Sequence, residues 1–339
     1  MTSRPSVLIV THSGDAEVPD LVARAVEKRG ATPCRLDTDR FPMETRIAVR
    51  QDSTAPPRWI LRQETDEIDL DGIQGVWYRR VAAPRLDEVD EKYRAACRDE
   101  SRALLLGLFS SLDHARWVDP IARVRQAEHK ILQLEVARRV GLAVPDTLTT
   151  NDPDDVRRFH EAHGGRIVSK MQHAFAVKDG GAELAYFTRP VPPEDLEKLA
   201  GLRYAPMVFQ EYVEKDVELR VTVVGERVFA ASIESQKSDL ARHDWRRDGY
   251  GLAGQFRSDR LPPDIESRVL ALQRELGLLY GALDFIRTPD GRHVFLEVNP
   301  AGEWGWLELQ VGLPISGALA DLLTGAVRVD RPPPRFGRV

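Results

Sequence analysis

A hairpin near the end of the chain constrains the fold most. Residues 281–299 read GALDFIRTPDGRHVFLEVN, in which two apolar runs rich in β-branched and aromatic residues flank the turn sequence TPDG. This pattern predicts two antiparallel strands joined by a short loop. If Arg287 pairs with Arg292 across the loop, Asp284 lies opposite Phe295. The sequence therefore predicts a sheet in which an acidic residue interrupts an apolar strand.

Three oxygen-bearing side chains are expected to converge on one face of this sheet. Glu297 and Asn299 are two residues apart on one strand, so they share a face, and the predicted pairing adds Asp284 and Phe295 to it. Carboxylate and amide oxygens suit Mg²⁺, which takes its remaining ligands from waters and substrate phosphates. A lone acidic residue on a sheet is more often a solvated surface group, but an aromatic ring on the same face needs cover. We therefore expect the floor of a cleft that holds Mg²⁺.

Basic residues elsewhere could supply the positive charge that metal-bound phosphates require. Lys130 lies in the predicted helix RQAEHKILQLEVARRVG, and Lys170 ends the predicted strand RIVSK. A lysine is a compact point charge that suits a phosphate oxygen. Arg220 shares a strand face with Glu218 in VELRV, and its planar guanidinium can hold a phosphate or a carboxylate. Ordinary surface lysines and a surface ion pair are the alternatives.

The strand VFQEYV, residues 208–213, is a candidate for recognising a nucleotide base. Its backbone N–H and C=O groups, at Gln210, Glu211, Tyr212 and Val213, could read adenine, or they could belong to a plain sheet strand. By contrast, the helical motif HEAH at 160–163 offers two histidines without a third ligand. A solvated helix face is expected there rather than a zinc site.

Composition limits the class of protein. The chain has 339 residues, of which 42% are hydrophobic, so it can bury a sizeable core in two or three domains. A net charge of −5 makes nucleic acid and anionic membranes poor candidate partners. No apolar run approaches the roughly 18–20 residues that cross a bilayer, and the two cysteines form no metal or disulfide motif. We expect a cytoplasmic protein.

The order of these parts resembles the ATP-grasp superfamily and, more narrowly, the microviridin-type graspetide synthetases, which are ATP-grasp ribosomal peptide maturases. The resemblance rests on VWYRRVAAPRL, VPDTLTTNDP, QEYVEKDVELRVTVVGERVFAA and FLEVNPAGEWGW, and it spans nearly the whole chain. It implies an α/β (α+β) ATP-grasp fold that follows an N-terminal pre-ATP-grasp α/β domain. The expected domains are residues 1–120, a central ATP-grasp subdomain at 121–203 and a C-terminal ATP-grasp subdomain at 204–330.

The resemblance also implies a role for each candidate residue in binding ATP. Lys130 and Lys170 would contact the phosphates, and the backbone of Glu211 and Val213, within the segment from Gln210 through Tyr212, would form the adenine hinge. Glu218 would lie near the ribose.

The same resemblance assigns the chemistry to a second group of residues. Arg220 would lie by the γ-phosphate and the carboxylate to be activated, with Lys170 beside it, and Arg246 would bind a carboxylate of the core peptide. Mg²⁺ would be held by Asp284, Glu297 and Asn299. Members of this family phosphorylate an Asp or Glu side chain of a ribosomal precursor peptide and then close an ester with Thr or Ser, or an amide with Lys.

The implied partner is a precursor peptide with a leader and an acidic, Thr-rich core. The leader would dock at about residues 172–201, where Glu194, Asp195 and Glu197 could meet basic leader residues. Relatives often carry Gln where this chain has Glu303, and the resemblance allows a homodimer. An ATP-grasp ligase that adds free amino acids such as glutamate is the main alternative, and a non-catalytic nucleotide-binding subunit is a third.

Overall fold

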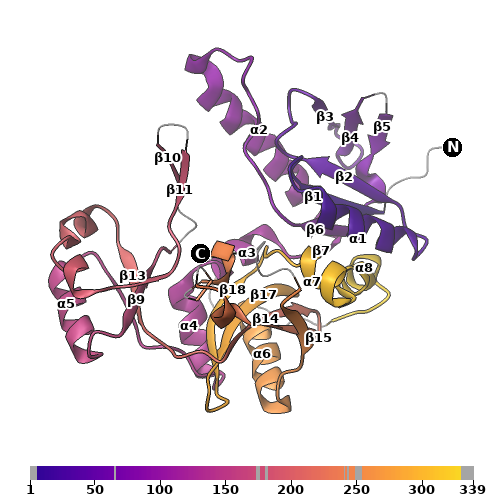
Figure 1. The fold of residues 1–339 in the computed structure, drawn as a ribbon. Coiled ribbons are helices and arrows are strands. Elements are labelled where there is room, and N and C mark those ends of the chain that lie inside the picture. The colour runs from indigo at the N-terminus through magenta and orange to yellow at the C-terminus, as the bar shows by residue number, and fades with distance from the viewer. Residues whose placement is uncertain are drawn as a thin grey trace.

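The structure, a computed structural model, describes residues 6–64, 66–172, 176–179, 182–239, 241–242, 244–248 and 254–329; at 176–179 and 182–185 only the backbone is described. Figure 1 shows three lobes: the indigo and purple N-terminal lobe, a magenta middle lobe around β9 and β13, and an orange C-terminal lobe around β14 and β17. None of the helices within these ranges is long and apolar enough to cross a membrane.

A parallel sheet in the order β2-β1-β6-β7 forms the centre of the N-terminal lobe. Its strands are β1 (Val7–Thr11), β2 (Pro33–Asp37), β6 (Gly75–Tyr78) and β7 (Arg116–Val118). One face packs on α1 (Glu17–Glu27) and the C-terminal helix α8 (Ile315–Thr324), and the other packs on α2 (Glu91–Ser111). Burial on both faces explains why the first strand is an unbroken apolar run. A second sheet packs against α2 through β4 and contains β3 (Thr45–Arg50), β4 (Arg58–Gln63) and β5 (Asp66–Asp69).

The middle lobe is a small antiparallel sheet covered by a helix. The strand order is β12-β9-β13-β8, with β8 (Thr147–Thr150), β9 (Ile167–Lys170), β12 (Arg189–Pro190) and β13 (Met207–Glu211). Helix α5 (Pro153–Ala162) packs on it. A hairpin projects from this lobe in Figure 1 and is formed by β10 (Ala176–Asp179) and β11 (Ala182–Ala185). The segment between β12 and β13 contains two 3₁₀ turns, Pro193–Asp195 and Leu199–Tyr204.

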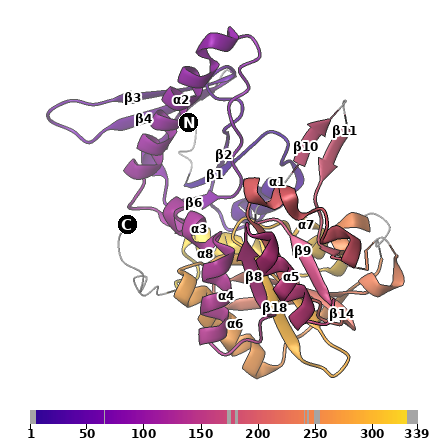
Figure 2. The same cartoon turned by 90° about the vertical axis from the view of Figure 1, so that its left-hand side faces the viewer.

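The C-terminal lobe is an antiparallel sheet in the order β16-β15-β14-β17-β18. Its strands are β14 (Val217–Val224), β15 (Arg227–Ile233), β16 (Phe256–Asp259), β17 (Tyr280–Arg287) and β18 (His293–Asn299). One face packs on α3 (Ile121–Ala127), α4 (Lys130–Arg139) and α6 (Pro263–Leu276), as Figure 2 shows for α4 and α6. The other face shares a core with α7 (Gly305–Val311), α8 and the parallel sheet, so one continuous core joins the two large lobes.

Two local predictions are wrong. The helix expected over residues 125–141 is two helices, and Lys130 is the first residue of the second. The hairpin register also differs, because the loop is longer than expected and a β-bulge follows it. Arg287 pairs with His293, and Asp284 pairs with Glu297 instead of Phe295.

The bulge also changes which side chains share a face. An extra residue on one strand reverses the alternation beyond it. Phe295 is therefore fully buried against Phe285 in the core, with ring centroids 5.5 Å apart. Leu296, instead of Phe295, lines the cavity with Glu297 and Asn299.

Candidate functional site

A cavity of about 580 Å³ lies between the middle-lobe sheet and the five-stranded sheet. Its size is typical of small-molecule sites. The middle lobe contributes β9 and the end of β13, the C-terminal lobe contributes β14, β17 and β18, and α4 closes one side. The cavity collects nearly all the residues that the sequence singled out: Lys130, Lys170, Gln210, Glu211, Tyr212, Val213, Glu218, Arg246, Asp284, Glu297 and Asn299. Arg220 is not among its lining residues.

Glu297 lies at the centre of the charge arrangement. Its Oε2 accepts a hydrogen bond from Lys130 Nζ, and its Oε1 lies 3.3 Å from Arg246 Nη1. Burial by itself would raise the pKa of Glu297, but Lys130, Lys170 and Arg246 together hold that pKa well below its usual range. Glu297 is therefore ionised at neutral pH, with three cations around it.

Asp284 lies opposite Glu297 on β17 and is held by two arginines. Its Oδ1 accepts a hydrogen bond of 2.9 Å from Arg220 Nη1, and its Oδ2 lies 3.8 Å from Arg246 Nη1. Arg220 is buried, and its Nη2 also donates to the Glu303 carbonyl at 3.0 Å. Arg220 thus orients Asp284 from outside the cavity, and its direct contact with phosphate stays a prediction.

Gln133 positions Lys130, and sequence reasoning missed it. The Gln133 side chain forms two hydrogen bonds with the backbone of Val298, as a neighbouring strand would. Its Oε1 accepts from the Val298 N–H at 2.9 Å, and its Nε2 donates to the Val298 carbonyl at 2.8 Å. Nε2 also donates to the Ala127 carbonyl at 2.6 Å, where α3 ends. These bonds fix α4 against the strand that carries Glu297. The sequence does contain a sign of this role, because Gln133 is a polar residue on the face of α4 that meets the core.

The predicted adenine hinge keeps one donor free. The Glu211 N–H donates to the Asp146 carbonyl at 3.0 Å, and the Tyr212 N–H donates to the Arg166 carbonyl at 2.8 Å. The Val213 N–H has no hydrogen-bond partner within the described part of the chain. Because Val213 lines the cavity, this donor is available to a ligand there.

Glu218, predicted to lie near the ribose, is buried beside a lysine that sequence reasoning missed. Its Oε1 accepts from Lys215 Nζ and from Ser235 Oγ, each at 2.8 Å. Burial raises the pKa of Glu218, and Lys215 and Ser235 oppose that rise. The pair is held rigidly, since the Lys215 side chain is also almost fully buried.

Lys170 faces Glu297 across the cavity. Burial lowers the pKa of Lys170 to about 8; Glu297 opposes the shift, and Lys130 adds to it. Arg246 is held on the same side by Asp244, whose Oδ1 accepts from Arg246 Nε at 2.8 Å. Burial would lower the pKa of Arg246, but Asp244, Asp284 and Glu297 raise it well above its ordinary value. The cavity therefore presents fixed positive charge to an anionic ligand.

The donor set on the sheet fits a hard divalent cation. Asp284 and Glu297 offer carboxyl oxygens on adjacent strands, and both form ion pairs with arginine or lysine, so cations already surround these oxygens. The Asn299 Oδ1 accepts from Ala301 N–H at 2.9 Å, which leaves it a second lone pair. Two carboxylates and an amide oxygen match the ligands of Mg²⁺.

One histidine of the HEAH motif, His163, lies near two carboxylates, but the motif's other histidine, His160, is not part of that group. Possible ligand atoms of Asp146, His163 and Glu211 lie within 4.8 Å of one another. His163 Nδ1 lies 2.9 Å from the Phe159 carbonyl, and Nε2 lies 3.4 Å from Asp146 Oδ2. The carboxylates come from a loop and a strand end distant in sequence, which a local motif does not show.

The expected leader-docking region is described in part. Asp195 already pairs with Arg189 at 2.7 Å and with Lys198 at 3.5 Å. Glu194 and Glu197 are exposed and remain available to a basic partner. Residues 173–175, 180 and 181 lie outside the described residues, so leader docking there stays a prediction.

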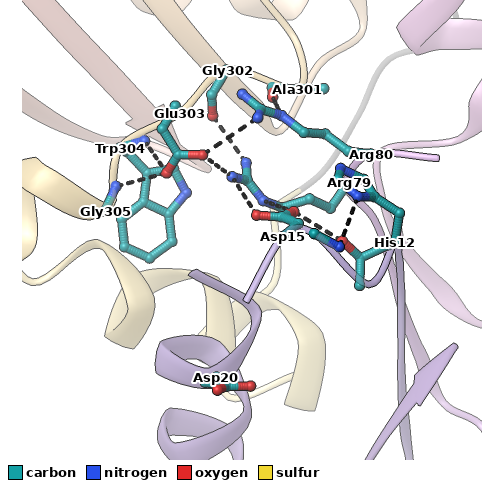
Figure 3. Close-up of polar contacts among 12 residues, drawn as sticks. His12, Asp15, Asp20, Arg79, Arg80, Ala301, Gly302, Glu303, Trp304 and Gly305 are labelled. Carbon is teal, nitrogen blue, oxygen red and sulfur yellow. Dashed lines mark hydrogen bonds and ion pairs between the residues drawn. The ribbon is translucent and has the colours of Figure 1, made fainter. Parts of the chain in front are cut away.

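The loop after β18 is fastened to the N-terminal lobe. Figure 3 shows Arg79 between Asp15 and Glu303: its Nε lies 3.1 Å from Asp15 Oδ2, and its Nη2 donates to Glu303 Oε2. Arg79 Nη1 and the Tyr280 hydroxyl both donate to the Gly302 carbonyl, at 3.1 Å and 2.6 Å. Close approach explains the glycine, because a Cβ at 302 would lie 2.5 Å from Ala282 Cβ.

Comparisons with known proteins identify the family. Residues 6–125 match the family model of the MvdD pre-ATP grasp domain. The chain is 41% identical to the macrocyclase MdnC from Microcystis aeruginosa MRC, solved with its precursor peptide MdnA; the match covers 94% of this chain and 99% of that chain, with a TM-score of 0.85. The chain belongs to the graspetide-type ATP-grasp ligases. The expected fold class and the expected enzyme class are thereby confirmed.

Other relatives of this ATP-grasp ligase carry names that describe different activities. A RiPP-associated ATP-grasp ligase from Chryseobacterium gregarium, solved with ADP and a leader and core peptide, is 35% identical over 99% of both chains, with a TM-score of 0.90. A curated relative from Pseudoalteromonas translucida (strain TAC 125), named a probable alpha-L-glutamate ligase, is 26% identical over 209 residues. That match covers 61% of this chain and 66% of the relative.

Proposed function

We propose that this ligase activates Asp or Glu side-chain carboxylates of a ribosomally made precursor peptide with ATP and closes ester or amide rings. The observation that carries the proposal is the 41% identity, over nearly the full length, to a macrocyclase solved with its precursor peptide. The cavity supports it, because lysines of two elements face two carboxylates and an amide across a space between two sheets.

The nucleotide would lie between the two sheets. The free Val213 N–H and the neighbouring Glu211 backbone suit the edge of adenine, and the rigid Glu218 suits a ribose hydroxyl. Lys130 and Lys170 face the place where the phosphates would reach the sheet. Mg²⁺, when bound by Asp284, Glu297 and Asn299, would neutralise phosphate charge.

The chain's cations favour the first chemical step. A carboxylate oxygen of the peptide attacks the γ-phosphorus of ATP, the bond to the β-phosphate oxygen breaks, and ADP leaves with its electron pair. Negative charge moves onto phosphate oxygens, so fixed positive groups such as Lys170 and Arg246 lower the barrier. Asp244 holds Arg246 in place before the substrate binds, which avoids a reorganisation cost for this group.

The second step closes the ring. A Thr or Ser hydroxyl, or a Lys amine, attacks the acyl carbon, the bond to the phosphate oxygen breaks, and inorganic phosphate leaves. The proton of the attacking group ends on the departing phosphate or on solvent. The peptide thus loses one water for each ring, while ATP becomes ADP and phosphate.

Mass spectrometry tests the proposal against its alternative. The enzyme is incubated with ATP, Mg²⁺ and MdnA, the precursor peptide with which the related macrocyclase MdnC was solved. We expect a loss of one water mass per ring and one phosphate released per ring. The named glutamate ligases, at 26% identity, favour a second candidate: addition of free glutamate. Incorporation of labelled glutamate without water loss in the peptide would replace our proposal with that one.

A further inference from the structure

The carboxyl ends of the parallel strands β1 and β6 in the N-terminal lobe lie beside the loop after β18. In the order β2-β1-β6-β7 the chain adds β2 on one side of β1 and β6 on its other side, so the order of strand addition reverses between β1 and β6. Open α/β sheets bind ligands beyond the carboxyl ends of the strands at such a reversal point. Residues 12–15 follow β1 here, and Arg79 and Arg80 follow β6. Figure 3 places these segments beside residues 301–305, just after the metal-ligand candidate Asn299.

The first of the two arginines is fully committed to the fold. The Arg79 side chain is only 1% exposed, and its Nε and both terminal nitrogens bind Asp15, Gly302 and Glu303. It fastens the loop to the N-terminal lobe and has no group left for a ligand.

Arg80 differs in both exposure and bonding. Its side chain is 39% exposed, and within the described part of the chain it donates one hydrogen bond, from Nε to the Ala301 carbonyl at 3.3 Å. Its Nη1 lies 3.6 Å from Glu303 Oε2, beyond hydrogen-bond distance. The bond from Nε nevertheless fixes the guanidinium beside the loop. The Ala301 N–H in turn donates to Asn299 Oδ1, so Ala301 links Arg80 to the predicted magnesium ligand Asn299 by hydrogen bonds.

Glu303 forms an ion pair with Arg80 but accepts no hydrogen bond from it. Its Oε2 accepts from the buried Arg79, and its Oε1 accepts from the N–H groups of Trp304 and Gly305, each at 3.0 Å. Nη1 of Arg80 thus has only the 3.6 Å ion-pair contact with Glu303, and within the described part of the chain neither terminal nitrogen of Arg80 donates a hydrogen bond. A guanidinium whose terminal nitrogens are available binds a carboxylate through two parallel hydrogen bonds.

We propose that Arg80 binds a side-chain carboxylate of the acidic core peptide at the carboxyl ends of β1 and β6. This inference rests on the proposed function and adds a substrate-binding residue from the N-terminal lobe to it. It places part of the core peptide on the far side of the loop 300–303 from the nucleotide cavity. Arg80 would thereby select acidic cores and hold them beside the activation site.

The test measures binding of two forms of MdnA, the precursor peptide with which the related macrocyclase MdnC was solved. One has its native core, and in the other every core Asp and Glu is replaced by Asn or Gln while the leader is unchanged. Dissociation constants are measured by fluorescence anisotropy with ADP and Mg²⁺, so no turnover is needed. The enzymes are wild type, Arg80→Ala, Arg80→Lys and the control Arg85→Ala. Arg85 is an exposed arginine of the same segment that pairs with Asp39 and Glu44.

We expect wild type and Arg85→Ala to prefer the acidic core by roughly tenfold, the range of one charge-assisted hydrogen-bond pair at a partly exposed site. Arg80→Ala should lose most of that preference, with Arg246 accounting for what remains, and Arg80→Lys should keep a larger part of it. The inference is overturned if wild type shows no preference, if Arg80→Ala keeps it, or if Arg85→Ala loses as much. Failure of the proposed function is seen separately, as absence of water loss when wild type is incubated with MdnA and ATP.

Discussion

The depressed pKa of Lys170 predicts that nucleotide binding weakens at an unusually low pH. Lysine ordinarily titrates near pH 10.4. Burial brings the pKa of Lys170 to about 8, even though Glu297 favours the charged form. A group with that pKa is about nine tenths protonated at pH 7 and about one tenth protonated at pH 9. If the ammonium binds a phosphate, affinity falls as pH rises through 8.

The assay is the dissociation constant of ADP with Mg²⁺, measured by calorimetry from pH 6.5 to 9.5. We expect affinity to fall about tenfold between pH 7 and pH 9 in wild type. Lys170→Arg keeps its charge over this range, because arginine stays protonated, so its affinity should be flat. Lys170→Met lacks the charge, so its affinity should be weak and equally flat.

Two results would refute the reasoning. A wild-type profile that is flat up to pH 9 would mean that Lys170 is not desolvated as the structure places it. A fall at the same pH in Lys170→Met would mean that another group titrates. Circular dichroism at each pH excludes unfolding as the cause.

Two further predictions concern the metal-ligand candidates and the bond between lobes. Glu297→Ala and Asn299→Ala should each lower the rate of ring formation by about 10²-fold or more, because charge on the phosphates is no longer neutralised; unchanged thermal unfolding with retained activity would remove the magnesium assignment. Arg79→Met should lower the free energy of unfolding by about 3–5 kcal/mol, because it leaves Asp15 buried without its cation; urea denaturation measures this, and a loss below about 1 kcal/mol would contradict it.

The sequence predicted those features that depend on periodicity. The apolar stripe of α6 is readable in the sequence, with Ile265, Val269, Leu272 and Leu276 at helical spacing, and it packs on the five-stranded sheet. The alternation that placed Glu297 and Asn299 toward one cleft was also right, since both line the cavity. These patterns survive because one buried face fixes the rotation of a helix or strand.

What the sequence did not predict depends on single irregular bonds. The bulge that buries Phe295 and turns Leu296 to the cavity adds one residue to one strand, and no residue type demands it. Gln133 of α4 joins α3 and β18 through three hydrogen bonds to backbone groups. One is to the Ala127 carbonyl at the end of α3, and two are to Val298, which is distant in sequence. Arg79 meets Glu303 across 224 positions of sequence. Pairings of this kind are set by tertiary packing and leave no local period to read.

The hydrogen bonds between Gln133 and Val298 also exclude one site of peptide binding. Strand β18 is the last of its sheet, and an open margin of this kind would accept an extended chain as a further strand. Gln133 occupies both polar groups of Val298, and the Ala143 carbonyl accepts the Phe295 N–H at 2.8 Å. A substrate must therefore be recognised through its side chains or at another margin, while the ligand-bearing strand keeps its shape whether or not a peptide is present.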